Sequence, residues 1–553
     1  MEHKLAEDQN GGHLLVACLK NLGAKHAFGV SGESYLEALD GLFDTKENLP
    51  FTGSRNEGGG AYMAEAYGKL TGTPGICFVT RGPGATNASI GVHSAMQAST
   101  PMLLFIGQVG AELRDREAFQ EVDYRAFFSP IAKWAVEIND ADRIPEIVSR
   151  AWSTAMSGRA GPVVISLPED MLSAPVTAAA CGPIKIAEPA PTIDQISEMG
   201  EKLDAAKAPL VIVGGSGWTA QGKADLRNFV EGQGIPCVTA FRYLDLLDNN
   251  SPSFAGHAGV GMAASVRNLI DKSDLILAIN IRFGEMTTDA YTLFDTPKMK
   301  QVLIHSHLGA EELNKIYQAD VPLVSGPNQM VAGLNSLAVK PRWADFCQTA
   351  RADFKAGLIV PAQPSPVDMG VVTQILQDKL DDDAILTNGA GNFAIWLSKH
   401  FLFGENQRLL APQSGAMGYG VPAAVAAKVL DRRRQVVCVA GDGDFQMNCQ
   451  ELGTALQMDA QPIILIVNNG SYGTIRMHQE RDFPHRVSGT EIINPDFSAL
   501  ARSYGFHGER VETTAKFADA FDRALASKTG AVLDLNVAVE AITPLKTLTQ
   551  FQS

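Results

Sequence analysis

The sequence contains no apolar run long enough to cross a membrane and no basic run longer than the three arginines 432–434. Its longest apolar runs, such as 101–106 and 462–467, have the length of a strand and fall far short of the ~20 residues that a membrane helix needs. Acidic residues outnumber basic ones, 61 against 46, which gives a formal net charge of −15 at pH 7. The composition therefore argues against a surface for nucleic acid or for an anionic membrane.

Cysteines at metal-binding or redox spacing are also missing. The seven cysteines are scattered, and no two of them have the Cys-x-x-Cys spacing. Residues 1–8 lack the basic and apolar segments of a secretory signal. An odd, scattered set of cysteines is typical of a reducing compartment, so we expect a cytoplasmic protein.

Strand-like and helix-like segments alternate along a chain of 553 residues, which is too long for one hydrophobic core. Two stretches with several prolines, 174–192 and 359–366, have the composition of linkers. We therefore expect an α/β protein with three doubly wound parallel-sheet domains, at 1–175, 190–340 and 366–553. In the middle segment, a strand at 209–213 leads into a Gly-rich stretch, 214–217, which is either a nucleotide-binding turn or a plain structural turn.

Two apolar, β-branched runs near the C-terminal end stop abruptly at polar residues. Residues 434–440 lead into Gly441-Asp442-Gly443, and residues 462–467 lead into Asn468-Asn469. This pattern predicts two neighbouring parallel strands whose carboxyl ends carry metal and phosphate ligands. Each motif alone is no more than a turn, but the pair at this spacing resembles the fingerprint of thiamine diphosphate (ThDP) enzymes.

Mg²⁺ accepts few protein ligands when phosphate oxygens supply the rest. Asp442 can give a carboxylate oxygen, Asn469 an amide oxygen and Ser471 a main-chain carbonyl oxygen. Gly441 and Gly443 allow the backbone to turn tightly around the ion. Residues 444–458 are predicted to form one helix, with Asp444 at its capping position and its free N–H groups facing the anion.

A ThDP enzyme also needs one glutamate in a dry pocket, hydrogen-bonded to N1′ of the cofactor's pyrimidine. Glu57 fits, because Ser54-Arg55-Asn56-Glu57 ends at a predicted helix that opens with three glycines, 58–60. On position alone, a solvated acid at a helix start is the better interpretation. The ThDP fingerprint reverses that preference.

The whole chain resembles the family of acetohydroxyacid synthases, pyruvate oxidases and decarboxylases, which are ThDP enzymes. The resemblance makes 1–175 the pyrimidine-binding domain, 190–340 the central domain and 366–553 the diphosphate-binding domain. Residues 81–87 match the family's GPGxxN loop, so that Pro83 flanks the pyrimidine and Asn87 lies nearby. Residues 119–121 match its FQE element and place Gln120 beside the reacting centre.

Residues 414–420 are similar to the segment that bends the cofactor in this family. The Gly415 carbonyl would accept a hydrogen bond from the 4′-amino group, and Met417 would wedge between the two rings. Without the flanking glycines, Met417 would read as a gap-filling core methionine. The resemblance implies cofactor contacts at Ala390, Gly391, Asn392, Phe393, Gly441, Asp442, Gly443, Asp444, Asn469, Ser471, Tyr472 and Gly473.

The expected function is a ThDP- and Mg²⁺-dependent carboligase, similar to acetolactate synthase, that decarboxylates a 2-oxo acid such as pyruvate and passes the acyl anion to a second carbonyl. The alternative is a decarboxylase or lyase that releases free aldehyde. Aldehyde-releasing relatives carry an adjacent histidine pair in the first domain, and residues 112–128 contain no histidine. A flavin oxidase and a silent ThDP-binding protein are further alternatives, and the intact Glu57 argues against the silent one.

Three departures from the synthases matter. Arg282-Phe283-Gly284-Glu285 lacks the arginine that follows an RFDD motif, so the acceptor is an aldehyde or an oxo acid held by Arg476 or His478, unless those two are plain surface residues. FAD is left open but not favoured, because residues 302–308 lack the synthases' Asp-rich pattern. Asn56 stands where many relatives have histidine. Since Glu57 and the GDG motif come from different subunits in this family, we expect a homodimer or homotetramer with active sites at the subunit interfaces.

Overall fold

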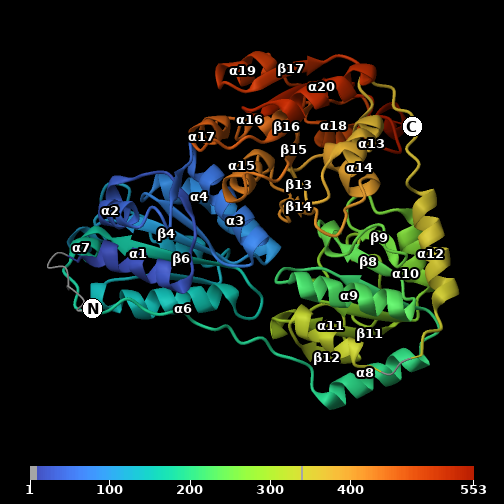
Figure 1. Cartoon of the computed structure of the whole chain (residues 1–553), viewed down its shortest axis with the longest axis horizontal. Coiled ribbons are helices and arrows are strands. Elements are labelled where there is room, and N and C mark those ends of the chain that lie inside the picture. The colour runs from blue at the N-terminus through green and yellow to red at the C-terminus, as the bar shows by residue number, and fades with distance from the viewer. Residues whose placement is uncertain (1–8, 338–339, 553) are drawn as a thin grey trace. The chain divides into compact units, whose positions relative to one another are not determined.

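The computed structural model describes residues 9–337 and 340–552. It contains three six-stranded sheets in which every strand pair is parallel, and helices flank each sheet (Figure 1). The expected α/β class with three parallel sheets is confirmed. Residues 1–8, which lack a visible secretory signal, lie outside the described residues. In the part of the chain that is described, no helix is both long and apolar enough to span a membrane.

The first sheet has the strand order β2-β1-β3-β4-β6-β5. Its strands are β1 (Ala27–Gly29), β2 (Phe51–Gly53), β3 (Gly75–Val79), β4 (Met102–Gln108), β5 (Trp134–Glu137) and β6 (Pro162–Pro168). Its helices are α1 (Gly11–Leu22), α2 (Leu36–Asp44), α3 (Glu57–Thr71), α4 (Pro83–Ala98), α5 (Tyr124–Phe128), α6 (Ile144–Met156) and α7 (Glu169–Ser173).

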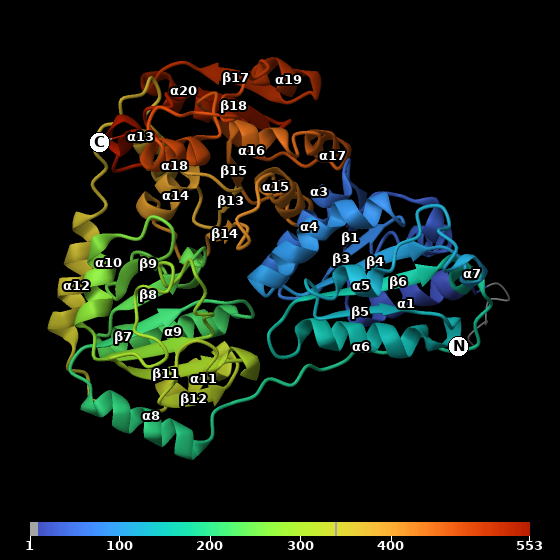
Figure 2. The same cartoon turned by 180° about the vertical axis from the view of Figure 1, so that it is seen from behind.

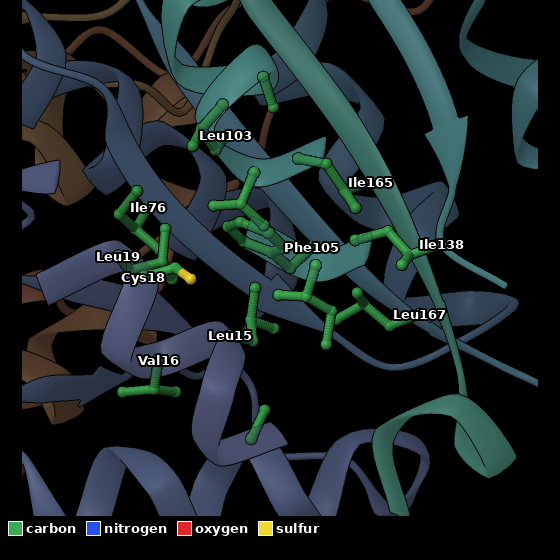
Figure 3. Packing of buried hydrophobic residues seen from close by; sticks show 14 of the residues in the cluster. Leu15, Val16, Cys18, Leu19, Ile76, Leu103, Phe105, Ile138, Ile165 and Leu167 are labelled. Carbon is green, nitrogen blue, oxygen red and sulfur yellow. The ribbon is translucent and has the colours of Figure 1, made fainter. Parts of the chain in front are cut away.

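The core of this sheet forms because α1 presents apolar residues at helical spacing to strands that are buried on both faces. Leu15 and Leu19 pack with Ile76, Phe105 and Leu167 (Figure 3). Burying each such side chain contributes about 1.5–3 kcal/mol. This packing holds the carboxyl ends of β2 and β3, from which α3 and α4 start.

The middle sheet has the order β12-β11-β10-β7-β8-β9. Its strands are β7 (Pro209–Val213), β8 (Cys237–Ala240), β9 (Phe254–Ala258), β10 (Leu275–Ile279), β11 (Val302–His307) and β12 (Val321–Val324). Its helices are α8 (Ile193–Ala205), α9 (Ala220–Gln233), α10 (Ala264–Lys272), α11 (Pro327–Asn335) and α12 (Ala344–Ala356). Strand β10 stops at Ile279, because Asn280 adopts a left-handed φ of 55°.

The last sheet has the order β14-β13-β15-β16-β18-β17. Its strands are β13 (Ile385–Asn388), β14 (Arg408–Leu410), β15 (Val436–Gly441), β16 (Ile463–Asn468), β17 (His507–Val511) and β18 (Ala531–Asn536). The helices are α13 (Met369–Lys379), α14 (Phe393–His400), α15 (Gly420–Leu430), α16 (Asp442–Gln446), α17 (Glu451–Gln457), α18 (Gly473–Asp482), α19 (Phe497–Ser503), α20 (Thr514–Ala526) and α21 (Thr549–Gln552).

The single helix predicted at 444–458 is wrong. Two short helices, α16 and α17, replace it, and turns at 447–450 separate them. Asn448 is a poor helix former, and its side-chain oxygen accepts a hydrogen bond from Gln450 Nε2 at 3.1 Å. Asp444 is not a cap either: Gly441 holds the N-cap position of α16, and Asp444 lies inside the helix.

The chain divides into two compact units. The first contains residues up to 187 together with 425–430 and 448–460, and the second contains the remainder. Helix α17 thus belongs to the same unit as the first sheet. The stretch 174–192, which leads to α8, contains no helix or strand, as predicted (Figure 2).

Candidate active site

The carboxyl ends of β15 and β16 lie side by side in the second unit. Gly441 is in register with Val467, so Asp442 and the turn after Asn468 begin at the same edge of the sheet. Asp442 Oδ2 accepts a hydrogen bond from Gly470 N at 2.8 Å. The two motifs singled out in the sequence therefore meet.

Asp442 is almost fully buried, with 2% of its surface exposed. Its Oδ2 also accepts from Asn494 Nδ2 at 2.7 Å, whereas Oδ1 accepts only from Gly443 N, at 3.0 Å, among the described residues. Burial raises the pKa of this carboxyl, and these three donors act against that shift. A second lone pair on Oδ1 is the natural place for a cation.

The turn after β16 supplies the other expected ligands. Asn469 Oδ1 accepts from Ser471 N at 3.1 Å, and the Ser471 carbonyl accepts from Gly473 N at 2.8 Å. The Ser471 hydroxyl donates to Thr490 O at 2.9 Å, which fixes the turn from behind. Tyr472 is 37% exposed, and Gly473 begins α18.

Asp444 joins two of the expected cofactor turns. Its Oδ1 accepts from Gly418 N at 2.7 Å and from Ala390 N at 3.3 Å. Its Oδ2 is buried and has no hydrogen-bond partner among the described residues. Burial raises the pKa of Asp444 to about 7, and the nearby Arg242 guanidinium acts against that shift.

Arg242 reaches these turns from the loop after β8. Its guanidinium donates to the main-chain carbonyls of Pro412 and, at 3.3 Å, of Gly389. Desolvation lowers its pKa to about 10, which still leaves it charged at neutral pH. Sequence reasoning missed this residue, because nothing in its surroundings marks it as part of a site.

The segment expected to bend the cofactor is open at Gly415. Gly415 has a left-handed φ of 67°, and no atom lies within 4 Å of the position that a Cβ would take. Met417 is half-buried and precedes Gly418, whose φ is 78°. The turn 389–393 packs on α18, since Asn392 N donates to Thr474 Oγ1 at 2.9 Å. Gly391 and Phe393 flank Asn392 in that turn.

In the first unit, Glu57 is the first residue of α3, and Asn56 caps the helix by accepting from Gly58 N at 2.8 Å. Glu57 Oε2 accepts from Asn87 Nδ2, on α4, at 2.9 Å. Pro83, at the start of α4, is exposed like Asn87. The structure thus brings together the residues expected at the pyrimidine end.

Glu451, on α17, holds the turn before Glu57. Its carboxylate accepts from Arg55 N at 3.1 Å and 3.2 Å, from Asn56 N at 3.0 Å and from Thr454 Oγ1 at 2.6 Å. Glu451 is fully buried, which raises its pKa, and these donors act against the shift. The sequence carries no local signal for the contact with the turn before Glu57, because Asn56 and Arg55 lie 395 and 396 positions away.

Gln120 is held on a tight loop with a left-handed φ of 64°. A Cβ on Gly82 would lie 2.8 Å from the Gln120 Cβ, so the two segments touch. Gly82 N donates to Tyr124 Oη at 2.7 Å, and Arg81 Nε donates to Phe119 O at 3.3 Å. The GPGxxN loop therefore supports the loop that carries Gln120.

The middle sheet has a dinucleotide-binding strand order, with its switch point between β7 and β10. Side chains occupy that point: Asn280 Nδ2 donates to Gly214 O at 3.3 Å and to Ser216 O at 2.7 Å. Thr219 N, at the start of α9, donates to Asn328 Oδ1 at 2.9 Å. The first acidic residue after β8 is Asp245, which is buried and pairs with Arg408 at 2.8 Å. These contacts argue against a flavin dinucleotide at this point.

Arg476, one of the two candidates for holding the acceptor, has another partner, and so does Arg282 of the segment that departs from the RFDD motif. Arg476 pairs with the buried Glu480 one helical turn along α18, at 2.9 Å. Arg282 lies 3.6 Å from Glu312. His478 is half-buried on α18.

The diphosphate end fits a phosphate-bound cation. Asp442 and Asn469 offer oxygens that Mg²⁺ prefers, and glycines line the turns. No group of three His, Cys, Asp or Glu side chains in residues 9–337 and 340–552 could hold a metal. A cation here would therefore depend on amide, main-chain and phosphate oxygens.

Three family models match this chain: "Thiamine pyrophosphate enzyme, N-terminal TPP binding domain" over residues 9–127, the central domain over 196–334 and the C-terminal TPP binding domain over 389–535. The chain belongs to the thiamine pyrophosphate enzyme family. It is a ThDP-dependent enzyme that acts on C–C bonds, as the sequence predicted.

Within this family, the chain is similar to the large subunits of acetolactate synthases. The acetolactate synthase large subunit of Corynebacterium glutamicum is 31% identical over 94% of this chain and 85% of its own length. That of Lactococcus lactis subsp. lactis is 30% identical over 93% and 90%. The acetolactate synthase isozyme 2 large subunit of Escherichia coli strain K12 is 28% identical over 97% of both chains.

Proposed function

We propose that this protein is a ThDP- and Mg²⁺-dependent carboligase, similar to acetolactate synthase, that decarboxylates a 2-oxo acid such as pyruvate and transfers the acyl anion to a second carbonyl. The meeting of Asp442 and the Asn469 turn at one sheet edge carries the proposal. Similarity to acetolactate synthases along nearly the whole chain supports the reaction type.

The proposed roles follow from the contacts. Asp442 Oδ1, the Asn469 amide oxygen and the Ser471 carbonyl would hold Mg²⁺, while Glu57 would bind N1′ of the pyrimidine. ThDP, when bound, supplies the electron sink for decarboxylation. Gln120, Gly415 and Met417 would orient the reacting end, and we keep 1–175, 190–340 and 366–553 as the proposed domain limits.

The acceptor is proposed to be an uncharged carbonyl rather than a carboxylate-bearing oxo acid. Arg476 is engaged by Glu480, so it is not available as a bidentate clamp for a carboxylate. His478 is the remaining candidate for an anionic acceptor. An aldehyde acceptor needs neither residue.

We further propose that no flavin is bound, because Asn328 already accepts from Thr219 N, an N–H group at the start of α9 that a dinucleotide phosphate would need. A purified protein with a flavin absorbance band would overturn this point. A homodimer or homotetramer in the cytoplasm is the proposed state. The seven cysteines, none in a disulfide, agree with a reducing compartment.

The test is product analysis after incubation with ThDP, Mg²⁺, pyruvate and a panel of aldehydes and 2-oxo acids. We expect an acyloin formed with an aldehyde, in larger yield than acetolactate from pyruvate alone. Release of free aldehyde as the only product would replace this proposal with the decarboxylase or lyase alternative.

A further inference from the structure

We infer that Asn494, Asn468 and Asp534 form a hydrogen-bonded chain that positions Asp442 for the divalent cation. This inference rests on the proposed metal site. Asn494 Nδ2 donates to Asp442 Oδ2 at 2.7 Å and to Asn468 Oδ1 at 2.8 Å. Asn468 Nδ2 donates to Asp534 Oδ1 at 2.8 Å. None of the three residues is an expected ligand.

The acceptor at one end, Asp534, decides which groups donate and which accept along this series of hydrogen bonds. Asp534 is fully buried on β18, and Arg510 Nη1 lies 3.4 Å from its Oδ2. Burial raises the pKa of the Asp534 carboxyl, and Arg510 acts in the opposite direction. The Asp534 carboxylate, which faces this guanidinium, can only accept hydrogen bonds. Asn468 therefore turns its NH₂ group toward Asp534 and its oxygen toward Asn494.

The Asn494 amide, in the middle of this hydrogen-bonded series, cannot flip without losing hydrogen bonds. Asn494 Oδ1 accepts from Gln446 Nε2 at 2.9 Å, so its NH₂ group remains for Asn468 and Asp442. If the Asn494 amide flipped, its oxygen would face the Asp442 carboxylate, and two acceptors would meet. The orientation of Asn494 is therefore set from both sides.

As a result, the two carboxylate oxygens of Asp442 have different roles. Oδ2 receives Asn494 Nδ2 and Gly470 N, whereas Oδ1 keeps a lone pair for the cation. Groups that orient a metal ligand in this way are worth about 10–100-fold in metal affinity. Asn494, Asn468 and Asp534 are thus positioning residues, and they do not touch the cation themselves.

The experiment is calorimetric titration of Mg²⁺ into the full-length protein with saturating ThDP. Asn494→Ala and Asp534→Asn should each weaken Mg²⁺ binding by about 10–100-fold. In both variants kcat should recover at high Mg²⁺, which a general folding defect would not allow. Asn536→Ala is the matched control. Asn536 ends β18, the strand that carries Asp534, but its side chain donates to Glu512 at 3.1 Å. Its Mg²⁺ affinity should equal that of the wild type.

The outcomes separate the two levels of the proposal. If the wild type takes up no Mg²⁺ with ThDP, the proposed metal site fails. If the wild type binds and both variants bind within about twofold of it, the positioning chain fails alone. Should Asn494→Ala not fold, Asn494→Ser takes its place, because the shorter side chain cannot bridge to both partners and predicts the same loss.

Discussion

Glu451 Oε1 accepts the backbone N–H of Asn56 at 3.0 Å, one residue before Glu57. The helix that carries Glu451 follows the GDG motif in the sequence, yet it belongs to the first sheet's unit together with Asn56. A buried carboxylate from the last third of the chain therefore sets the backbone from which the proposed activating glutamate projects.

Replacing Glu451 tests that support. Glu451→Ala leaves the N–H groups of Arg55 and Asn56 without an acceptor in a buried place, so we expect a loss of about 2–4 kcal/mol in the free energy of unfolding, measured with urea. Glu451→Gln should lose less, because an amide oxygen remains. Gln457→Ala is the control, since Gln457 accepts from the exposed Arg55 side chain at 2.8 Å rather than from the backbone that Glu451 holds. Equal stability of Glu451→Ala and wild type would contradict the assignment.

Glu57→Gln tests the proposed activating carboxylate. A glutamine cannot share a proton with the pyrimidine, so turnover should fall by about 10²–10⁴-fold while ThDP binding persists. Steady-state kinetics and calorimetry measure the two effects separately. The assignment of Glu57 is wrong if the rate is unchanged.

Gly82→Ala tests the contact between the GPGxxN loop and the Gln120 loop. The new methyl group would meet Gln120 at 2.8 Å, and the left-handed φ of 61° at Gly82 disfavours any side chain. We expect a clear loss of kcat and of thermal stability. Gly53→Ala is the matched control, because nothing lies within 4 Å of its Cβ position. A variant Gly82→Ala that behaves like Gly53→Ala would refute the contact.

Asp444 predicts a pH dependence of the cofactor-free protein. Its folded pKa of about 7 lies above the ordinary value of 3.8, so the folded state binds more protons between these values and loses stability as the pH rises through that window. Asp444→Asn cannot ionise. It should therefore raise the unfolding temperature at about pH 8 and change it little at about pH 4. A thermal shift that is the same at both values would contradict this prediction.

The sequence predicted the parts of the fold that depend on local pattern. The apolar runs before Asp442 and Asn468 predicted two adjacent strands. The small residues after Glu57 predicted α3. Both predictions succeeded because strand burial and helix starts have local signals. The helix predicted at 444–458 was wrong, since the run of apolar spacing did not reveal the break near Asn448.

Contacts between segments far apart in the sequence could not be predicted. Glu451 binds residues that lie 395 and 396 positions away, and Asn494 reaches Asp442 from a loop 52 positions further on. Arg242 acts from a left-handed backbone that no motif marks. Such side chains are chosen by the tertiary fold, so a single sequence gives no means of finding them.

The membership of α17 in the first unit has a consequence for dissecting this protein. A fragment cut at the linker, ending near residue 187, would keep all of the first sheet but leave out the helix that seals the turn before α3. The two N–H groups held by Glu451 would then face solvent, and a groove would open along Gly59, whose Cβ position lies 2.5 Å from Glu451. The amino-terminal third of the polypeptide is thus an incomplete module, and residues 448–460, far along the sequence, complete it.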